Sequence, residues 1–431
     1  MRDPSIEEDF IMIEHSEAQN PYLSSISSYI DSLQHELRNV SLEIHDHPEL
    51  QYKEVHAHEV LTKYLKGKSG WKVTPSAYGI ETAFVAVFDS GRKGSVASRC
   101  VSFNAEYDAL KGIGHACGHN LIAVASVGGA LATAETMRKE ELGGKVVLFG
   151  TPAEEGGGGK IKLLNAGAYK DNNVDISLIS HPSIDPDAAL MRTAAYQSFK
   201  VEYFGKEAHA AARPWDGINA LDALITAYNA ISVLRQQTQP GDIIQGHITN
   251  GGLRPNIIHA YASGMFVVRS SNRARRDALN ERVQKCFEAG AHATGATLKV
   301  TPKGAYDDHM PNRVLGARYR EAFMTLGGEI KTPDLDWLEG TTMASTDQGN
   351  VSYAMPSISP NFWIRSEDKD GNQLGGPHTP DFEGAARTEE AHGLALRVAK
   401  ALSGTAVDIL MRPELLREAK REFEEMKREG W

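Results

Sequence analysis

Short apolar stretches recur along the first part of the chain, and each of them is followed by a loop. They lie at residues 83–88, 100–103, 146–149 and 176–179. Helical patterns occupy the intervening or preceding segments at residues 21–43, 54–64 and 120–138. Strand, loop and helix in alternation predict a parallel or mixed α/β sheet. Because ligands in such sheets lie at the carboxyl ends of strands, we expect the functional site in the loops that follow these stretches.

The pattern changes near residue 192. Strand patterns follow at residues 198–204, 246–249, 264–268 and 298–300, with helical patterns at 217–236 and 274–290. They predict a compact α+β unit with helices on one face of an antiparallel sheet. Strand-like and loop material then resumes, so this unit is inserted into the first domain. We therefore expect a catalytic domain of residues 1–190 and 306–431, with a loose tail at 1–16, and an inserted domain of residues 191–305.

Composition narrows the class of protein. The 431 residues are 41% hydrophobic and 24% charged, with a net charge of −10. This acidic balance argues against nucleic acid or an anionic membrane as the main partner. No apolar run is long enough to span a bilayer, and the start lacks a signal-peptide pattern. Three sparse cysteines argue against a disulfide framework, so we expect a cytoplasmic protein. The sequence also predicts a charged helix at 413–429. We expect its charges to face solvent, and a contact with a partner is the alternative.

Two stretches carry the types of side chain that bind divalent metals. His115–Asn120 offers a thiol and an imidazole one residue apart, and residues 151–159 offer two adjacent glutamates before a run of glycines. Each residue alone is a weak signal, since a buried Cys is usually a small hydrophobe and a His among glycines is usually structural. Together they favour a metal centre, with a second carboxylate available as general base. The candidates are Cys117, His119, Glu154, Glu155, His181 and His378.

A resemblance to a known family rests on stretches that span nearly the whole chain. They are His45–Leu50, Asp108–Leu110, His115–Asn120, Pro152–Gly156, Ser180–Pro182, Gly205–Ala210, Pro255–Ile258 and Gly376–Pro380. With these stretches the chain resembles the M20 metallopeptidase family, in particular its amidohydrolase branch, which includes aminoacylase-like dipeptidases. Within that branch, residues 114–120 are most similar to the peptidase M20 domain-containing protein 2 group.

The resemblance implies a two-domain M20-type fold with a mixed-sheet catalytic domain and an inserted α+β lid that also dimerises. It implies two divalent metal ions, Zn or Mn, with Co or Ni also compatible. The ligand positions fall on Cys117, His119, Glu155, His181 and His378. The position of the general base falls on Glu154.

Further roles follow from the same resemblance. Asp108 matches a carboxylate that orients a ligand imidazole, although an Asp there also suits a helix cap. His209 matches a lid histidine that stabilises an oxyanion, often from the partner subunit; otherwise it is a strand-end residue. Asn256 and Arg269 match positions that hold the free carboxylate of the substrate, although Arg269 also fits a solvated strand end. A homodimer through the lid is implied as well.

The function implied is hydrolysis of the amide bond of a dipeptide or an N-acyl amino acid with a free carboxylate, through a water activated by the metals and the base Glu154. Two alternatives stay open: an enzyme that forms amides from a specialised small molecule, and a relative that binds or regulates without hydrolysis. Lys111, Glu106, Asn120 and His259 differ from the usual residues of the branch. These differences leave the identity of the substrate open.

Overall fold

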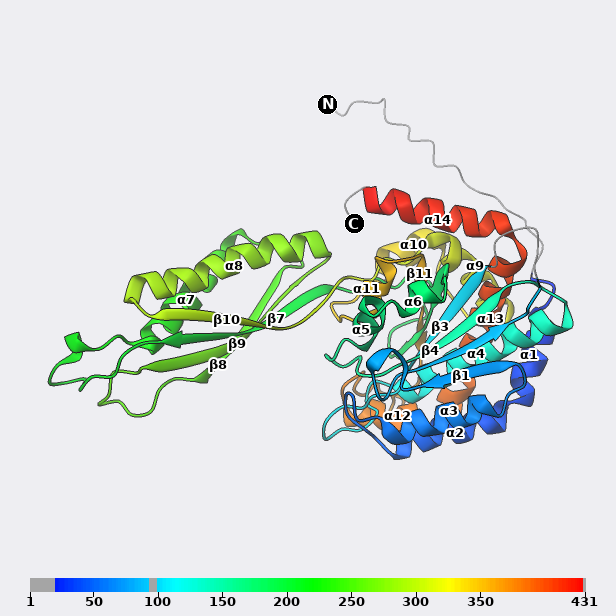
Figure 1. Ribbon diagram of the computed structural model, residues 1–431, viewed down its shortest axis with the longest axis horizontal. Coiled ribbons are helices and arrows are strands. Elements are labelled where there is room, and N and C mark those ends of the chain that lie inside the picture. The colour runs from blue at the N-terminus through cyan, green and yellow to red at the C-terminus, as the bar shows by residue number, and fades with distance from the viewer. Residues whose placement is uncertain (1–19, 93–98, 429–431) are drawn as a thin grey trace, which may run out of the picture.

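The computed structural model describes residues 20–92 and 99–428, so the tail predicted at 1–16 lies outside the described residues. Two bodies are visible, a larger one that carries both ends of the described chain and a smaller one built from its middle (Figure 1). The larger body contains a six-stranded sheet with the strand order β1-β2-β4-β3-β5-β11. Its strands are β1 (Trp71–Pro75), β2 (Phe84–Asp89), β3 (Cys100–Glu106), β4 (Lys145–Thr151), β5 (Ile176–Leu178) and β11 (Ser357–Ile358).

This sheet is mixed, as the sequence predicted. β4, β3, β5 and β11 run parallel, whereas β1 and β2 form an antiparallel edge. A separate pair of parallel strands, β6 (His181–Ser183) and β12 (Asn361–Trp363), lies beyond the carboxyl end of β5. The carboxyl ends of β3, β4 and β5 therefore meet at one edge of the sheet.

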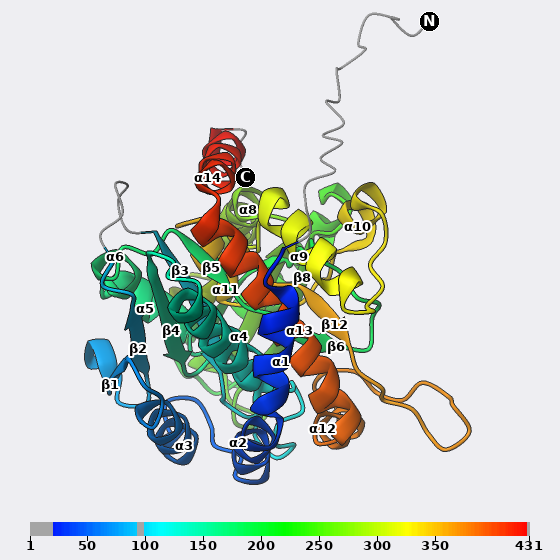
Figure 2. The same cartoon turned by 90° about the vertical axis from the view of Figure 1, so that its right-hand side faces the viewer.

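Helices cover both faces of the sheet. On one face α4 (His119–Lys139) packs on β3, and α13 (Glu389–Met411) packs on α4 (Figure 2). Gly129 permits this close approach, because a Cβ there would lie 2.9 Å from the ring of Phe103. The other helices of this layer are α1 (Leu23–Ser32), α2 (Gln34–Asp46), α3 (Val55–Lys66), α9 (Arg313–Thr325), α10 (Pro333–Glu339), α12 (Pro380–Ala386) and α14 (Pro413–Arg428). On the opposite face lie α5 (Gly159–Asn165), α6 (Ala168–Asp171) and α11 (Gln348–Ser352).

Two expectations for this body were wrong in detail. The helix predicted at 21–43 is two helices, α1 and α2, because the chain breaks at Leu33. The region after residue 306 is mainly helical rather than strand-like. Its longest helix, α13, is buried on most of its surface, so it has no polar stripe to reveal it. Within the described parts of the chain, no helix combines the length and apolarity that a membrane crossing needs.

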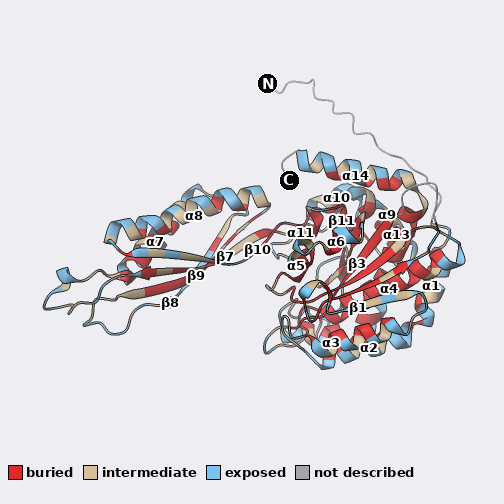
Figure 3. Cartoon of the chain, in the orientation of Figure 1, coloured by how far each residue is buried: buried red, intermediate tan, exposed pale blue. Residues whose placement is uncertain are grey.

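The smaller body is an antiparallel sheet of strand order β10-β7-β9-β8, with two helices packed on one face. Its elements are β7 (Ala195–Phe204), α7 (Ala220–Leu234), β8 (Ile243–Asn250), β9 (Tyr261–Ser270), α8 (Arg273–Thr294) and β10 (Thr297–Tyr306). This is the predicted α+β unit, called the lid below. Its core lies between the helices and the sheet, and much of its remaining surface is exposed (Figure 3).

Candidate metal centre

The polar residues that follow β3, β4 and β5 come together at the carboxyl edge of the sheet. Glu106 ends β3, Glu154 and Glu155 follow β4, and His181 begins β6 shortly after β5. The short turn that carries Cys117 and His119 leads into the amino end of α4 at the same edge. Loops that are distant in sequence therefore meet there, as strand-end logic requires.

Gly118 sets the geometry of the turn between Cys117 and His119. Its φ of +73° is a left-handed conformation, and a Cβ there would lie 2.6 Å from Cγ of Pro182. The loop that carries His378 is tied to the same turn, since the His378 amide donates to the carbonyl oxygen of Ala116 at 2.7 Å. At position 118, only glycine can adopt the positive φ and also avoid a clash with Pro182.

The five predicted ligands form two groups that share the sulfur of Cys117. One group joins Cys117 with His119 and His181, the other joins it with Glu155 and His378, and the donor atoms within each lie within 4.8 Å of one another. Sγ of Cys117 is 3.3 Å from Nε2 of His181, and Oε1 of Glu155 is 3.2 Å from Nε2 of His378. Two donors on one tetrahedral zinc ion lie about 3.4 Å apart, given bonds of roughly 2.0–2.3 Å. The spacings therefore fit two adjacent ions.

Buried polar atoms that lack hydrogen-bond partners at this edge are also consistent with bound cations. Nε2 of His119 and Oε2 of Glu106 are buried and accept or donate no hydrogen bond. Buried polar atoms without partners are uncommon, and an ion is one explanation for them. Burial raises the pKa of the Cys117 thiol, and a neighbouring Glu155 carboxylate raises it further. A thiolate there needs a compensating cation, and a set of sulfur, imidazole and carboxylate donors suits Zn, Mn, Co or Ni.

Asp108 orients two of these residues at once. Its Oδ1 lies 3.1 Å from Nδ1 of His119, and its Oδ2 accepts the backbone N–H of Glu155 at 2.9 Å. His181 has a similar arrangement, because its Nδ1 lies 2.8 Å from the carbonyl oxygen of Pro182. Each imidazole then donates through Nδ1 and turns the lone pair of Nε2 toward the centre.

The glutamate pair stands on a strained backbone. Ala153, just before Glu154, has a φ of +58°, and its N–H donates to Oε1 of Glu54 at 2.9 Å. The Tyr306 hydroxyl donates to the carbonyl oxygen of Glu154 at 2.6 Å. The glycine run permits the tight return of the chain, because a Cβ on Gly159 would lie 1.8 Å from the carbonyl oxygen of Pro152. Strain of this kind concentrates at functional sites.

The two adjacent carboxyls have different proton affinities. Burial raises the pKa of Glu154 well above its usual value, and the charges of Glu106 and Glu155 raise it further. Burial also disfavours the charged form of Glu155, but its hydrogen bond to His378 and the charge of His119 outweigh this and hold its pKa at about 2. Neighbouring carboxyls with opposite shifts are the pattern expected of a proton carrier beside a permanently ionised ligand.

Sequence reasoning missed a buried ionic cluster beside these residues. Nζ of Lys160 contacts Oε1 of Glu106 at 2.6 Å and Oδ1 of Asp347 at 2.5 Å, and all three side chains are buried. Glu106 was noted only as a departure from the branch, and Lys160 and Asp347 carried no local signal. Lys160 could have been found only as a charged residue placed directly after the glycine run.

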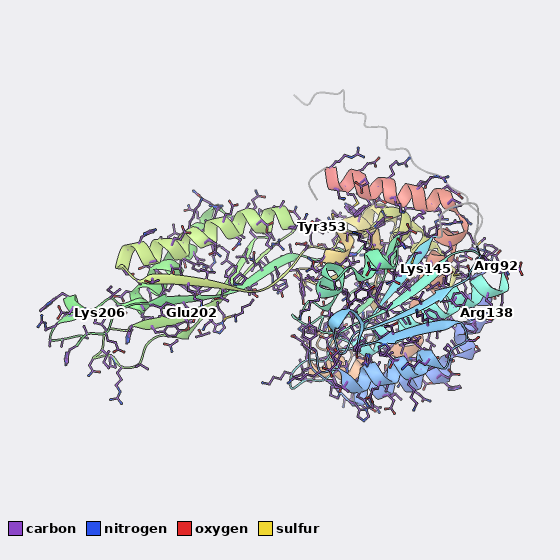
Figure 4. All side chains as sticks on the ribbon, viewed as in Figure 1. Arg92, Arg138, Lys145, Glu202, Lys206 and Tyr353 are labelled. Carbon is purple, nitrogen blue, oxygen red and sulfur yellow. The ribbon has the colours of Figure 1, made fainter. Side chains whose placement is uncertain are left out.

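The lid residues lie elsewhere. His209 is exposed, and its Nδ1 accepts the N–H groups of Ala211 and Ala212. A backbone bond from Ala210 to Asn256 places both loops together at the far tip of the lid, near the labelled Lys206 (Figure 4).

Arg269 lies at the opposite end of the lid, where its Nη1 donates to Ser345 Oγ at 2.9 Å. The eight residue steps from Tyr261 to Arg269 span about 27 Å at roughly 3.4 Å each. Within one chain, Asn256 and Arg269 therefore lie at opposite ends of the lid, and their shared role in holding the substrate carboxylate stays a prediction. His209 likewise lies away from the metal residues of its own chain.

Comparison with known proteins defines the family. Residues 194–294 match the peptidase dimerisation domain. Human Xaa-Arg dipeptidase is 40% identical over 406 residues, which cover 91% of this chain and 90% of that protein. The chain belongs to the M20 metallopeptidase family. The resemblance inferred from its motifs is confirmed, and this M20 protein is a metal-dependent hydrolase of amide bonds.

Solved structures agree on the fold. A Staphylococcus aureus protein described as an aminohydrolase superposes with a TM-score of 0.71 at 20% identity, covering 90% of this chain and 99% of that one. A dinuclear metal-binding M20 peptidase from Bacillus subtilis superposes with a TM-score of 0.66 at 19% identity, covering 89% and 99%. The predicted architecture, a mixed-sheet catalytic domain with an inserted dimerisation domain, is confirmed.

Proposed function

We propose that the protein is a two-metal dipeptidase that acts on dipeptides with a basic residue at the carboxyl terminus, and on N-acyl amino acids of the same kind. One observation carries the proposal: five donors from distant loops form two groups around one shared sulfur, next to Glu154. The preference for a basic residue is drawn from the 40% identity to a dipeptidase named for arginine.

Two divalent ions would occupy this centre, Zn or Mn, with Co or Ni also suited to the donors. Cys117 would contact both, His119 and His181 would complete one set, and Glu155 and His378 would complete the other. When bound, the ions supply Lewis acidity, which polarises the substrate carbonyl and lowers the pKa of a water. Asp108 holds the His119 imidazole and the Glu155 backbone in the orientation that metal binding needs.

Glu154 moves the proton. Its carboxylate takes a proton from the attacking water as a carbon–oxygen bond forms at the substrate carbonyl. The same proton is then delivered to the amide nitrogen as the carbon–nitrogen bond breaks, which releases an amine and a carboxylic acid. The raised pKa of Glu154, caused first by its burial, suits a group that must both accept and return a proton.

A homodimer through the lid would complete the site. Residues 191–305 form this domain in our proposal, and β8 is an edge strand whose middle residues are exposed. On α7, the apolar side chains of Ile225, Tyr228 and Val233 are also exposed. If the β8 edges of two chains pair antiparallel, the tip of one lid approaches the opposite end of the other, which carries Arg269. His209 and Asn256 of one chain would then meet the Arg269 end of the partner.

In that arrangement His209 would donate to the oxyanion, while Asn256 and Arg269 would hold the substrate carboxylate. Small-molecule substrates and a second copy are the only partners in this proposal, with no role for nucleic acid or a membrane. We place the protein in the cytoplasm, because its three cysteines are free.

The test is a panel of dipeptides and N-acetyl amino acids assayed with and without a chelator. We expect hydrolysis that is fastest for carboxyl-terminal Arg or Lys, lost with the chelator and restored by Zn or Mn. A panel without hydrolysis by the metal-loaded enzyme would contradict the proposal. Product analysis with the free amine and acid supplied instead separates hydrolysis from amide formation, since one site serves both directions.

The variant Glu154→Gln separates a catalyst from a binding relative. It should retain metal but lose roughly 100-fold or more of the turnover, because it cannot accept a proton. Glu135→Gln, which removes a carboxylate from the outer end of α4, is the matched control and should leave turnover unchanged. Equal loss in both variants would point to a structural effect.

A further inference from the structure

Glu106, the last residue of β3, directs one carboxylate oxygen toward the metal residues and the other away from them. It is 1% exposed. Oε1 accepts from Nζ of Lys160 at 2.6 Å. Oε2 has no hydrogen-bond partner and lies 3.5 Å from Nε2 of His119. A buried carboxylate oxygen that faces an imidazole nitrogen without a hydrogen bond to it is unusual. A group bound between the two atoms would explain this arrangement.

The other half of this carboxylate is fixed in place. Lys160 follows directly after Gly159 at the start of α5, and Asp347 directly precedes the neighbouring α11; the two helices lie side by side (Figure 1). Lys160 is fully buried, its ammonium contacts Glu106 and Asp347, and its backbone N–H donates to Asp347 at 2.8 Å. Glu106 therefore cannot turn its free oxygen away without breaking a buried ion pair.

The charges around Glu106 do not balance within the protein. Lys160 is one positive charge between two carboxylates, and the carboxyl groups of Glu154 and Glu155 approach the same Nε2 of His119 that Glu106 faces. A buried negative excess is costly unless a cation offsets it. The excess lies on the side of Glu106 that faces His119, because Lys160 already contacts the opposite oxygen.

The spacing identifies the cation's place. Glu106, His119 and Glu154 form a third group of possible donors, one atom from each, which lie within 4.8 Å of one another. The 3.5 Å between Oε2 and Nε2 of His119 matches the roughly 3.4 Å between two donors on one four-coordinate ion. Asp108 already occupies Nδ1 of His119, so Nε2 is the nitrogen that faces Glu106.

We propose that Glu106 is a sixth metal ligand, which binds through Oε2 the same ion as His119, and that Lys160 and Asp347 are its positioning residues. The inference rests on the proposed two-metal centre and adds to it. A carboxylate adds a hard, negatively charged oxygen donor to this ion, whose other predicted ligands are sulfur and imidazole. The affinity of the protein for this ion therefore depends on Glu106, Lys160 and Asp347, which lie outside the five predicted ligands.

The test measures metal binding rather than activity. Metal-free wild type, Glu106→Gln and Asp347→Asn are titrated with Zn or Mn in competition with a chromogenic chelator. We expect Glu106→Gln to weaken one of the two ions by roughly 100-fold or more, beyond the 10- to 100-fold typical of outer partners, and to leave the other ion nearly unchanged. Asp347→Asn removes a charge from the same Lys160 without facing the ion, so it should weaken that ion by less.

Glu106→Asp guards against a variant that does not fold. It keeps the negative charge but is shorter by one methylene, so the carboxylate no longer reaches the ion, and one ion should again bind more weakly. The proposal is overturned if Glu106→Gln or Glu106→Asp binds both ions within about threefold of wild type, or if Asp347→Asn is equally impaired. Wild type that binds no divalent ion would instead refute the two-metal centre itself.

Discussion

The substitution Asp108→Asn tests how the ligands are oriented. Asp108 accepts from two donors at once, Nδ1 of His119 at 3.1 Å and the N–H of Glu155 at 2.9 Å. An asparagine offers one carbonyl oxygen, so its NH₂ group must face one of these donors. A lost hydrogen bond to a charged group costs about 1.5–3 kcal/mol, which corresponds to roughly a 10- to 100-fold change in a binding constant. We expect the metal affinity of Asp108→Asn to fall by about that factor.

The assay is a competition titration of metal-free protein with a chromogenic chelator, together with urea unfolding of the same samples. Asp175→Asn is the matched control, since Oδ2 of Asp175 also accepts a backbone N–H, that of Cys100 at 2.8 Å, but at the opposite edge of the sheet. The control should lose stability and keep its metal affinity. The reasoning is refuted if Asp108→Asn binds both ions within about threefold of wild type.

Three further substitutions test the turn at Gly118, the hydrogen bond from Tyr306 to Glu154 and the pH response. Gly118→Ala places a Cβ 2.6 Å from Pro182 at a φ of +73°, so calorimetry should show a lower Tm with weaker metal binding, and an unchanged Tm would contradict the steric account. Tyr306→Phe leaves the buried carbonyl of Glu154 without its donor and should cost about 1–3 kcal/mol in urea unfolding; no loss would show that the bond is unimportant. Burial lowers the pKa of His392 to about 4 from 6.5, so the unfolded chain binds a proton that the folded one does not. The free energy of unfolding should therefore fall as pH drops from 6.5 to 4, by up to about 1.4 kcal/mol per unit for this histidine. His392→Phe should flatten that slope in a pH series, and a slope equal to that of wild type would disprove the assignment.

The position of the metal residues could be predicted because it depends on local rules. Apolar stretches mark the strands, and chemistry follows strand ends in a parallel sheet. Glu154, Glu155 and His181 all follow this rule. The closeness of Cys117 and His119 is fixed by one intervening glycine, which is visible in the sequence itself.

Other parts of the site depend on contacts that no local pattern reveals. Lys160 and Asp347 are 187 residues apart, and each is an ordinary charged residue until the fold pairs them. The long helix α13 was not predicted from the sequence, because most of its surface is buried and its amphipathic pattern is therefore weak. His209 and Asn256 lie at the tip of the lid, so in our proposal their place in the site depends on a second chain.

The most direct test of the central claim is anomalous diffraction from crystals of the Zn- or Mn-loaded protein. The account predicts two anomalous peaks, both within about 2.5 Å of Sγ of Cys117, with His119 and His181 beside one and Glu155 and His378 beside the other. A single peak, or a peak distant from Cys117, would contradict the shared-sulfur centre on which the proposed chemistry depends.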